Sequence, residues 1–223
     1  MNNRSIAIDG PSGAGKSTLA KKLAEELGYL YVDTGAIYRT VGLYVRRRDT
    51  DPRDAAAVAS LLPEIHIELR YGEDGLQHML LNGEDVTGAI REHEISAYAS
   101  HVSAIPAVRA YLLEMQRAMA RAHSVVMDGR DIGTTVLPRA DVKIYLTAAA
   151  ETRARRRYKE LLDRGQTAEY EKVLADVVAR DEEDMNRAVS PLRQAPDAVV
   201  VDTTWLDFDQ SLARLLEVCG EAK

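Results

Sequence analysis

The stretch Gly10-Pro11-Ser12-Gly13-Ala14-Gly15-Lys16-Ser17-Thr18 decides the fold of this chain. It fits the pattern Gly, any four residues, Gly, Lys, and then Ser or Thr. A short apolar run at Ser5–Asp9 precedes it, and a helical pattern at Leu19–Leu27 follows it. A strand, a glycine-rich loop and a helix in that order predict a P-loop, whose backbone N–H groups surround the phosphates of a nucleoside triphosphate.

Two side chains of this loop have predicted roles of their own. We expect Lys16 to reach the β- and γ-phosphates and the Ser17 hydroxyl to bind Mg²⁺. The helix that follows adds its free N–H groups and its dipole to the same anion site. The alternative is a glycine-rich turn without a ligand, which the agreement of the pattern and both flanks disfavours.

Composition limits the partners of the protein. The chain has 223 residues and a formal net charge of −6, which argues against nucleic acid and anionic membranes as partners. No apolar run approaches the roughly 18 residues of a membrane span, and the chain begins almost at once with the first strand, without a leader. The single cysteine, Cys219, suits a reducing compartment, and with Trp205 it is predicted to pack in the interior. We expect a cytoplasmic protein, with a monomer as the expected oligomeric state.

Five apolar runs have the character of buried strands and alternate with helical patterns. They are Ser5–Asp9, Tyr29–Asp33, Ser124–Asp128, Val142–Leu146 and Ala198–Asp202. Alternating strands and helices predict an α/β fold with a five-stranded parallel sheet. Ligands of such sheets bind beyond the carboxyl ends of the strands, so the residues that follow the strands are candidate site residues.

The segment 62–101 breaks this alternation and divides the core into residues 1–61 and 102–223. Ile65–Leu69 alternates apolar and polar residues, 72–75 has the composition of a turn, and His78–Gly83 follows as a second strand. A helical run covers Glu92–Ser100. We predict a small antiparallel sheet inserted into the α/β core.

Candidate site residues lie at the ends of two of the strand-like runs. Asp128 ends an apolar run, which in a P-loop protein is the place for a carboxylate that holds Mg²⁺ through water, and Arg130 follows it in a turn. Thr34 is predicted to cap a helix that begins near Ala36, with Arg39 one turn into that helix. The alternatives are a solvated turn with a local ion pair and a capped helix with a surface arginine.

Two further groups of arginines lie on predicted helices. One face of a predicted helix carries Arg153, Arg156 and Arg157. Their positive charges repel one another unless a bound anion, or nearby acids such as Glu160 and Asp163, neutralise them. In isolation, pairing with those acids is the favoured alternative. Arg180, Asp184 and Arg187 fall at i, i+4 and i+7 of a later helix, where simple ion pairs are the alternative.

The pattern of arginines without an identifiable general base has a chemical interpretation. A phosphate monoester has a second pKa of about 6, so at neutral pH its attacking oxygen is already deprotonated. Catalysis then needs only positioning and charge neutralisation. The residues therefore favour transfer of a phosphoryl group from a triphosphate to another phosphate.

Four motifs in order resemble the bacterial cytidylate kinase family, and the resemblance covers nearly the whole chain. They are Ile8–Thr18, Asp33-Thr34-Gly35-Ala36-Ile37-Tyr38-Arg39, Asp128-Gly129-Arg130-Asp131-Ile132-Gly133, and Arg180-Asp181 with Asp184 and Asn186-Arg187. The inserted segment is also similar to the nucleoside-monophosphate-binding domain of those enzymes. The resemblance implies transfer of the γ-phosphate of ATP to CMP and dCMP with Mg²⁺ as cofactor, and a short helical lid at about 153–165.

The resemblance also implies roles for individual residues. The implied catalytic residues are Lys16, Arg130, Arg153, Arg157 and Arg187, and the implied ATP contacts are Gly10, Pro11, Ser12, Gly13, Ala14, Gly15, Lys16, Ser17 and Thr18. The implied CMP contacts are Thr34, Arg39, Arg130 and Arg187 around the phosphate, Arg180 and Asp184 at the sugar, and Ser100, Arg109 and Asp131 at the base. Ser17 and, through water, Asp128 are the implied metal ligands; some relatives have Gly at the position of Ser17, which leaves the Thr18 hydroxyl or water as alternatives.

The implied base contacts suit cytosine. A carboxylate such as Asp131 can accept from the N4 amino group, and Arg109 can donate to N3 or O2. Uracil would leave Asp131 facing another acceptor. A kinase for a different nucleoside monophosphate or for shikimate, and a nucleotide-switched regulatory protein, are the competing interpretations.

Overall fold

The computed structural model describes residues 3–72, 77–163 and 165–220. Among these residues, no helix has the length and apolar character needed to cross a membrane. The elements in chain order are β1 (Ser5–Asp9), α1 (Lys16–Leu27), β2 (Leu30–Asp33), α2 (Thr34–Arg47), α3 (Ala55–Leu61), η1 (Leu62–Glu64), β3 (Ile67–Tyr71), β4 (Gln77–Leu81), β5 (Glu84–Asp85), η2 (Ala89–Arg91), α4 (His93–Ser103), α5 (Pro106–Ala122), β6 (Val125–Gly129), η3 (Ile132–Val136), β7 (Val142–Thr147), α6 (Ala150–Asp163), α7 (Tyr170–Asn186), β8 (Val199–Asp202) and α8 (Phe208–Val218).

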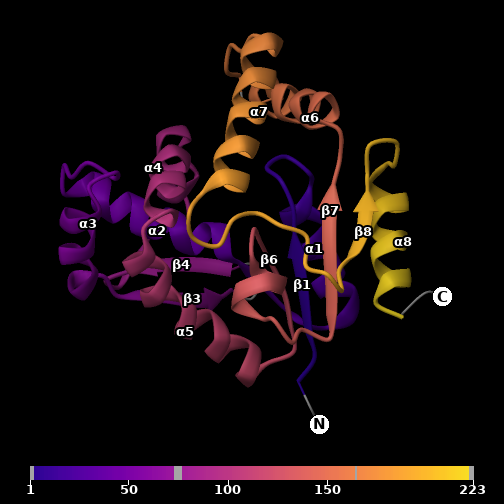
Figure 1. Cartoon of the computed structure of the whole chain (residues 1–223), viewed down its shortest axis with the longest axis horizontal. Helices are drawn as coiled ribbons and strands as arrows, with labels where there is room; N and C mark the ends of the chain where they lie inside the picture. The colour runs from indigo at the N-terminus through magenta and orange to yellow at the C-terminus, as the bar shows by residue number, and fades with distance from the viewer. Residues whose placement is uncertain (1–2, 73–76, 164, 221–223) are drawn as a thin grey trace. The chain divides into compact units, whose positions relative to one another are not determined.

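The larger sheet has the strand order β2-β6-β1-β7-β8 (Figure 1). This confirms the predicted five-stranded parallel sheet, and its strands lie within one residue of the predicted bounds. β1 occupies the centre, where Asp9 is paired with Gly129 of β6 and with Tyr145 of β7. The loop after β1 therefore begins between two neighbouring strand ends.

The core of this sheet is built from apolar residues of β1, β6, β7 and β8 packed against α1 and α8. Leu23 of α1, Ile144 of β7 and Leu215 of α8 belong to it and are almost fully buried. Cys219 is buried in the same cluster, as predicted. The prediction for Trp205 was wrong, because its side chain lies in the loop between β8 and α8 and is 90 % exposed.

The described residues form two compact units. The first contains the residues up to Tyr31 and those from Ala122 onward, and the second is Val32–Arg121. The antiparallel segment predicted at 62–101 lies inside the second unit, together with α2 and α5. The predicted limits of the inserted domain stay a prediction.

The second unit contains the three-stranded antiparallel sheet β3-β4-β5. It confirms the predicted antiparallel sheet, although β3 begins at Ile67 and residues 73–75 of the predicted turn lie outside the described residues. β4 and β5 are joined by Asn82 and Gly83, both with positive φ, which is the conformation of a two-residue hairpin turn. β5 was not predicted, because it is only two residues long.

Helix α2 of the second unit begins differently from the prediction. Asp33, not Thr34, is the residue before the helix, and its carboxylate accepts a hydrogen bond from Ala36 N at 2.8 Å. Thr34 is the first helical residue. α2 packs against α4 so closely at Gly42 that an added Cβ would lie 3.0 Å from Ala99 N.

In the first unit, α6 and α7 pack on each other and project beyond the carboxyl end of β7 (Figure 1). Their contact is formed by Ala154 with Val173 and Val177. Arg164 of the predicted lid lies outside the described residues. Arg187, predicted on the helix of Arg180, follows the last residue of α7 and has an extended backbone conformation.

Candidate active site

The loop between β1 and α1 has a backbone that requires glycine. Gly10 has φ of 150°, and a Cβ there would lie 1.9 Å from the carbonyl oxygen of Leu146. Gly13 and Gly15 also have positive φ, and Gly15 precedes α1 with no side chain capping that helix. The predicted triphosphate contacts, residues 10–18, thus form a loop and a helix start whose N–H groups suit an anion.

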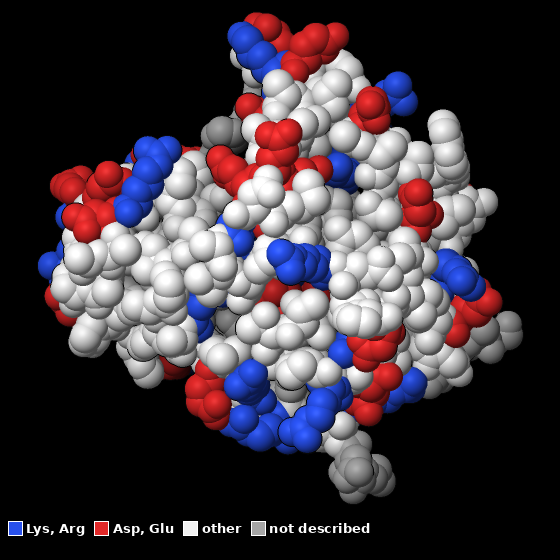
Figure 2. Space-filling model, viewed as in Figure 1, with Lys and Arg blue, Asp and Glu red and all other residues white. Residues whose placement is uncertain are grey.

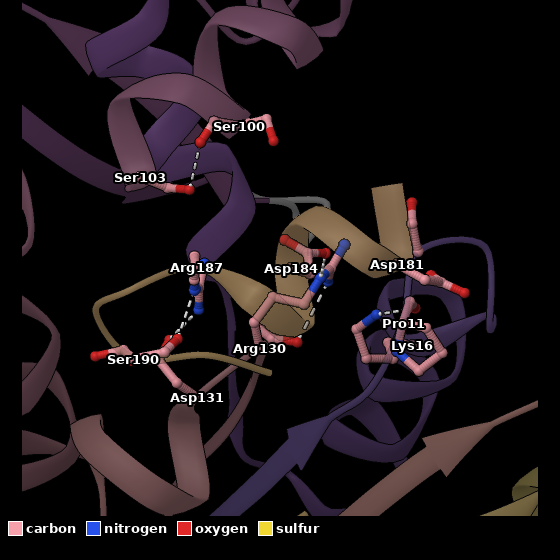
Figure 3. Close-up of polar contacts among 12 residues, drawn as sticks. Pro11, Lys16, Ser100, Ser103, Arg130, Asp131, Asp181, Asp184, Arg187 and Ser190 are labelled. Carbon is pink, nitrogen blue, oxygen red and sulfur yellow. Dashed lines mark hydrogen bonds and ion pairs between the residues drawn. The ribbon is translucent and has the colours of Figure 1, made fainter. Parts of the chain in front are cut away.

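Lys16 lies at the base of this loop and is 6 % exposed. Its ammonium donates to the carbonyl oxygen of Pro11 at 2.7 Å (Figure 3). Burial, followed by the charge of Arg130, lowers the pKa of Lys16 to about 7. A bound phosphate would favour the charged form of this buried ammonium.

The predicted metal ligands Ser17 and Asp128 lie together in the first unit. The Ser17 hydroxyl donates to Asp128 Oδ2 at 3.0 Å, and Tyr31 donates its phenolic hydrogen to Asp128 Oδ1 at 2.9 Å. A hydroxyl and a carboxylate are hard oxygen donors, so these residues fit Mg²⁺. Thr18, the alternative hydroxyl, is exposed in the first turn of α1. Tyr31 was missed, since nothing in its sequence context marks a carboxylate partner 97 residues away.

Asp9, the last residue of β1, is a buried carboxylate that sequence analysis did not assign. Its two oxygens accept hydrogen bonds from the backbone N–H groups of Ile132 and Gly133, each at 2.7 Å. Burial raises its pKa to about 6 despite these two hydrogen bonds. The sequence did contain a hint, because four of the strand-like runs end in Asp, but only Asp128 was predicted to have a role.

Arg130 and Asp184, both predicted site residues, form an ion pair with 2.7 Å between Nε and Oδ2 (Figure 3). Burial alone would raise the pKa of Asp184, but the charge and hydrogen bond of Arg130 lower it, with further help from Arg180 and Arg187. Asp184 is therefore a carboxylate surrounded by arginines. The sequence placed Arg180 and Asp184 on one helix, but it did not show that Arg130 joins them.

A second pair joins Arg187 to Asp131, with 3.5 Å between Nη2 and Oδ1. Arg187 Nε also donates to the carbonyl oxygen of Ser190. Figure 3 shows these residues beside the Arg130–Asp184 pair. The structure therefore brings Arg130, Asp131, Asp184 and Arg187 into one cluster, which we call the arginine cluster. The outer surface around α7 carries many acidic side chains in this view (Figure 2).

Arg153 of α6 differs from the predicted picture of a surface arginine. It is 4 % exposed, and its guanidinium binds both carboxylate oxygens of Asp181, at 3.0 and 2.6 Å. It also donates to the carbonyl oxygens of Ala148 and Ser12, at 2.8 and 3.0 Å. Arg153 thus ties α6 and α7 to the P-loop.

The other two arginines of the predicted face, Arg156 and Arg157, have different partners. Arg156 donates to the hydroxyl and carbonyl oxygens of Thr203, at 3.2 and 2.8 Å. Arg157 is partly exposed and pairs with Glu160 at 3.2 Å, which is the acid pairing that we named as the alternative. The three side chains therefore do not converge on one point in this structure.

Four predicted acceptor contacts lie in the second unit. Arg39 donates to Asp33 Oδ2 at 2.9 Å, and its buried Nε has no hydrogen-bond partner among the described residues. Arg109 is buried, donates to the carbonyl oxygen of Ser103 at 3.1 Å and lies 5.5 Å from the ring centre of Tyr38. The remaining contacts are Ser100, whose carbonyl oxygen accepts from the Ser103 hydroxyl, and Thr34, which is buried.

Comparison with known proteins gives the family of this chain. Residues 6–221 match the family described as cytidylate kinase. The chain belongs to the cytidylate kinase family. It is 48% identical over 218 residues to a cytidylate kinase of Caldicellulosiruptor bescii, covering 98% of this chain and 96% of that one. It is 50% identical over 214 residues to a cytidylate kinase of Symbiobacterium thermophilum, covering 96% and 95%.

Solved structures add little to this family assignment. A shikimate kinase from Bacteroides thetaiotaomicron aligns with 97% of this chain and 98% of its own, at 18% identity and a TM-score of 0.46. A likeness at that level does not discriminate between acceptors. Membership of the cytidylate kinase family rests on the sequence match.

Proposed function

We propose that this member of the cytidylate kinase family transfers the γ-phosphoryl group of ATP to CMP and dCMP. An oxygen of the acceptor phosphate attacks the γ-phosphorus, and the bond from that phosphorus to the oxygen bridging it to the β-phosphorus breaks. ADP leaves with the electron pair, and CDP or dCDP is the other product. The observation that carries the proposal is the family match over residues 6–221.

The P-loop is the donor side of the proposed site. Its three positive-φ glycines, Gly10, Gly13 and Gly15, give the loop a path along which N–H groups can converge on phosphate. Lys16 would exchange the Pro11 carbonyl for phosphate oxygens and neutralise charge on the β- and γ-phosphates. Mg²⁺ bound with ATP through Ser17 and, by way of water, Asp128 supplies further neutralisation of phosphate charge.

The arginine cluster supports an anionic acceptor. Arg130 and Arg187 are held by Asp184 and Asp131, so their guanidinium groups are oriented before any ligand arrives. We infer that they contact the acceptor phosphate, with Arg39 and Thr34 of the second unit, and that Arg180 and Asp184 contact the sugar. The unpartnered buried Nε of Arg39 supports its assignment, because a phosphate oxygen would satisfy it.

The reaction needs no general base from the chain. The acceptor phosphate has a second pKa of about 6 and is already deprotonated at neutral pH. Among the described residues, Asp9 has a carboxylate whose raised pKa would suit a general base. Both of its oxygens, however, already accept backbone hydrogen bonds. Positioning and charge neutralisation therefore carry the proposed catalysis.

Preference for cytosine is proposed to come from Asp131, Arg109 and Ser100. Asp131 would accept from the cytosine N4 amino group, which requires its pair with Arg187 to loosen or to be shared. Uracil would leave that carboxylate without its donor, at a cost of about 1–3 kcal/mol. The net charge of −6 supports small nucleotides rather than nucleic acids as partners, and the monomeric state and cytoplasmic location stay predictions.

Closure of α6 and α7 over the phosphates is part of the proposal. Arg153 and Arg157 would then contribute charge at the transferring group, and exclusion of water would suppress hydrolysis of ATP. Arg153 would have to give up at least one of its contacts with Asp181 and Ser12 to do so. Arg157, which pairs with the exposed Glu160, is less constrained.

The test is a coupled assay of ADP formation with CMP, dCMP, UMP, AMP and shikimate side by side. We expect fast ADP formation with CMP and dCMP and much slower formation with the other acceptors. A preference for another acceptor would assign the protein a different substrate. ADP formation that is independent of any acceptor and rises with a protein partner would support a nucleotide-switched regulatory protein instead.

A further inference from the structure

Asp9 stands at the junction of the two halves of the proposed site. It is the last residue of β1, and the P-loop begins with the next residue, Gly10. It is 4 % exposed, and neither the P-loop pattern nor the proposed mechanism uses its side chain. A buried carboxylate is costly unless its oxygens are satisfied, so its partners indicate what it does.

Those partners are the first two residues of η3 and directly follow Arg130 and Asp131, two predicted acceptor contacts; we call residues 130–133 the turn. Asp9 Oδ1 accepts from Ile132 N and Oδ2 accepts from Gly133 N, both at 2.7 Å. Hydrogen bonds from backbone N–H to a charged carboxylate are about twice as strong as neutral ones. Two consecutive N–H groups bound by two oxygens fix the turn in orientation as well as in position.

The turn has little freedom to compensate for a change in this contact. A Cβ added at Gly133 would lie 3.3 Å from Asp9 Oδ2 and 3.2 Å from Lys143 Cδ, so the carboxylate and the turn are in close contact. Asp131 directly precedes Ile132 and has φ of −145° and ψ of 29°, outside the regular helical and strand regions. The direction of the Asp131 side chain therefore depends on where Ile132 and Gly133 are held.

We propose that Asp9 is a positioning residue that holds the turn bearing Arg130 and Asp131 at a fixed place relative to the P-loop. The Asp9 carboxylate thereby connects the P-loop, which follows β1, to the turn that carries the proposed acceptor contacts. The proposal rests on the proposed function, because it assigns Asp131 to the acceptor base. It makes Asp9 a determinant of acceptor choice, although Asp9 itself touches no substrate.

The test compares Asp9→Asn, Asp9→Ala and Gly133→Ala with the wild type. An Asn side chain keeps one acceptor oxygen, an Ala side chain keeps none, and Gly133→Ala disturbs the same contact from the side of the turn. We expect the ratio of kcat/KM for CMP to kcat/KM for UMP to fall about tenfold in Asp9→Asn and further in Asp9→Ala. KM for CMP should rise while KM for ATP stays within about twofold of the wild type.

Asp141→Asn is the matched control, because Asp141 also accepts from a backbone N–H of β1, that of Ser5 at 2.7 Å, but at the opposite end of the strand. Its ratio of CMP to UMP use should equal that of the wild type. Each variant is first tested for cooperative thermal unfolding, and Gly133→Ala keeps the proposal testable if Asp9→Ala does not fold. An unchanged CMP-to-UMP ratio in folded Asp9→Asn and Gly133→Ala, with kcat/KM reduced equally for both acceptors, would overturn the proposal.

The wild type separates this result from failure of the proposed function. If wild-type protein does not use CMP at all, the proposed function fails before any variant is compared. If wild-type protein prefers CMP and the folded variants keep that preference, only the role of Asp9 fails.

Discussion

The P-loop and the arginine cluster bind charge in opposite ways. The P-loop is nine consecutive residues whose function depends on backbone conformation, with Gly10 passing so close to Leu146 that no side chain fits. The arginine cluster is assembled from residues 54 positions apart, as in the pair of Arg130 and Asp184, and depends on side-chain pairs. Local backbone geometry can be recognised in a sequence pattern, whereas a pairing between distant side chains requires the fold.

The two regions also hold their cations differently. Lys16 has a neutral partner, the Pro11 carbonyl, and a pKa lowered to about 7. Arg130 is held by a carboxylate, which raises its pKa although burial alone would lower it. On the proposed donor side, a phosphate would therefore meet a lysine whose charged form the phosphate itself must favour. On the proposed acceptor side, it would meet preoriented, permanently charged arginines.

The largest effect is expected on the donor side. Lys16→Met should lower kcat by about 10³-fold, since it removes a charge that acts on the transferring phosphoryl group. Lys22→Met is the control, because Lys22 lies on the same helix but forms exposed pairs with Glu25 and Glu26. Steady-state ADP formation measures both, and a loss of less than tenfold in Lys16→Met would show that the P-loop backbone alone suffices.

Arg153 should matter more for stability than Arg157. Removing Arg153 leaves the Asp181 carboxylate largely buried without its partner, so Arg153→Met should lower the free energy of unfolding by about 3 kcal/mol. Arg157→Met should change it by less than about 1 kcal/mol, because its pair with Glu160 is exposed. Urea unfolding measures the difference, and equal unfolding free energies would contradict the structural role of Arg153. In both variants, kcat should fall more than the affinity for CMP.

The acceptor side should give a selective loss. Arg130→Met should reduce kcat/KM for CMP by about 100-fold, with KM for ATP changed less than about threefold, because the proposed contact is to the acceptor phosphate. Arg46→Met is the control, since Arg46 forms an exposed pair with Glu94. Initial rates with each substrate varied in turn separate the two constants. A larger change in KM for ATP than for CMP would move Arg130 to the donor side.

Per pH unit, the smallest expected change in free energy is the dependence of stability on pH. The pKa of Asp9 is about 6 in the folded protein and about 3.8 when unfolded, so the folded state holds more protons between these values. Wild-type stability should therefore fall relative to Asp9→Asn as pH rises through this window, by at most about 1.4 kcal/mol per pH unit, and should level off above pH 6. Urea unfolding of both proteins between pH 3.5 and 7.5 measures the difference. A wild type that gains on the variant as pH rises would show a lowered pKa.

Much of the fold was predictable because its signals are local. The five parallel strands were found from unbroken apolar runs, and the antiparallel sheet was found from the alternation at Ile65–Leu69 and the turn composition of residues 72–75. The predicted cap of α2 was one residue too late, at Thr34 instead of Asp33. Both residues are good capping residues, and only the backbone conformation decides between them. The prediction that Trp205 packs in the interior was wrong, because an aromatic side chain alone does not show whether its loop is covered by other residues.

The site was only partly predictable. The predicted metal ligands Ser17 and Asp128 are joined by a hydrogen bond, and their role at a metal stays a prediction. The partners that orient the site residues, such as Tyr31, Asp181 and the turn bound by Asp9, could not be predicted, since each joins segments far apart in the sequence. The sequence alone does not show which acidic residue pairs with each arginine.

Tracing the γ-phosphoryl group tests the central claim most directly. ATP whose γ-phosphoryl oxygens carry a heavy oxygen isotope is incubated with the protein and CMP, and phosphorus NMR follows this label through its isotope shift between pH 5 and 8. The account predicts that the label appears in the β-phosphate of CDP, at a rate that follows the second ionisation of CMP near pH 6. Label released as inorganic phosphate at a rate independent of CMP would contradict a site built for two phosphates.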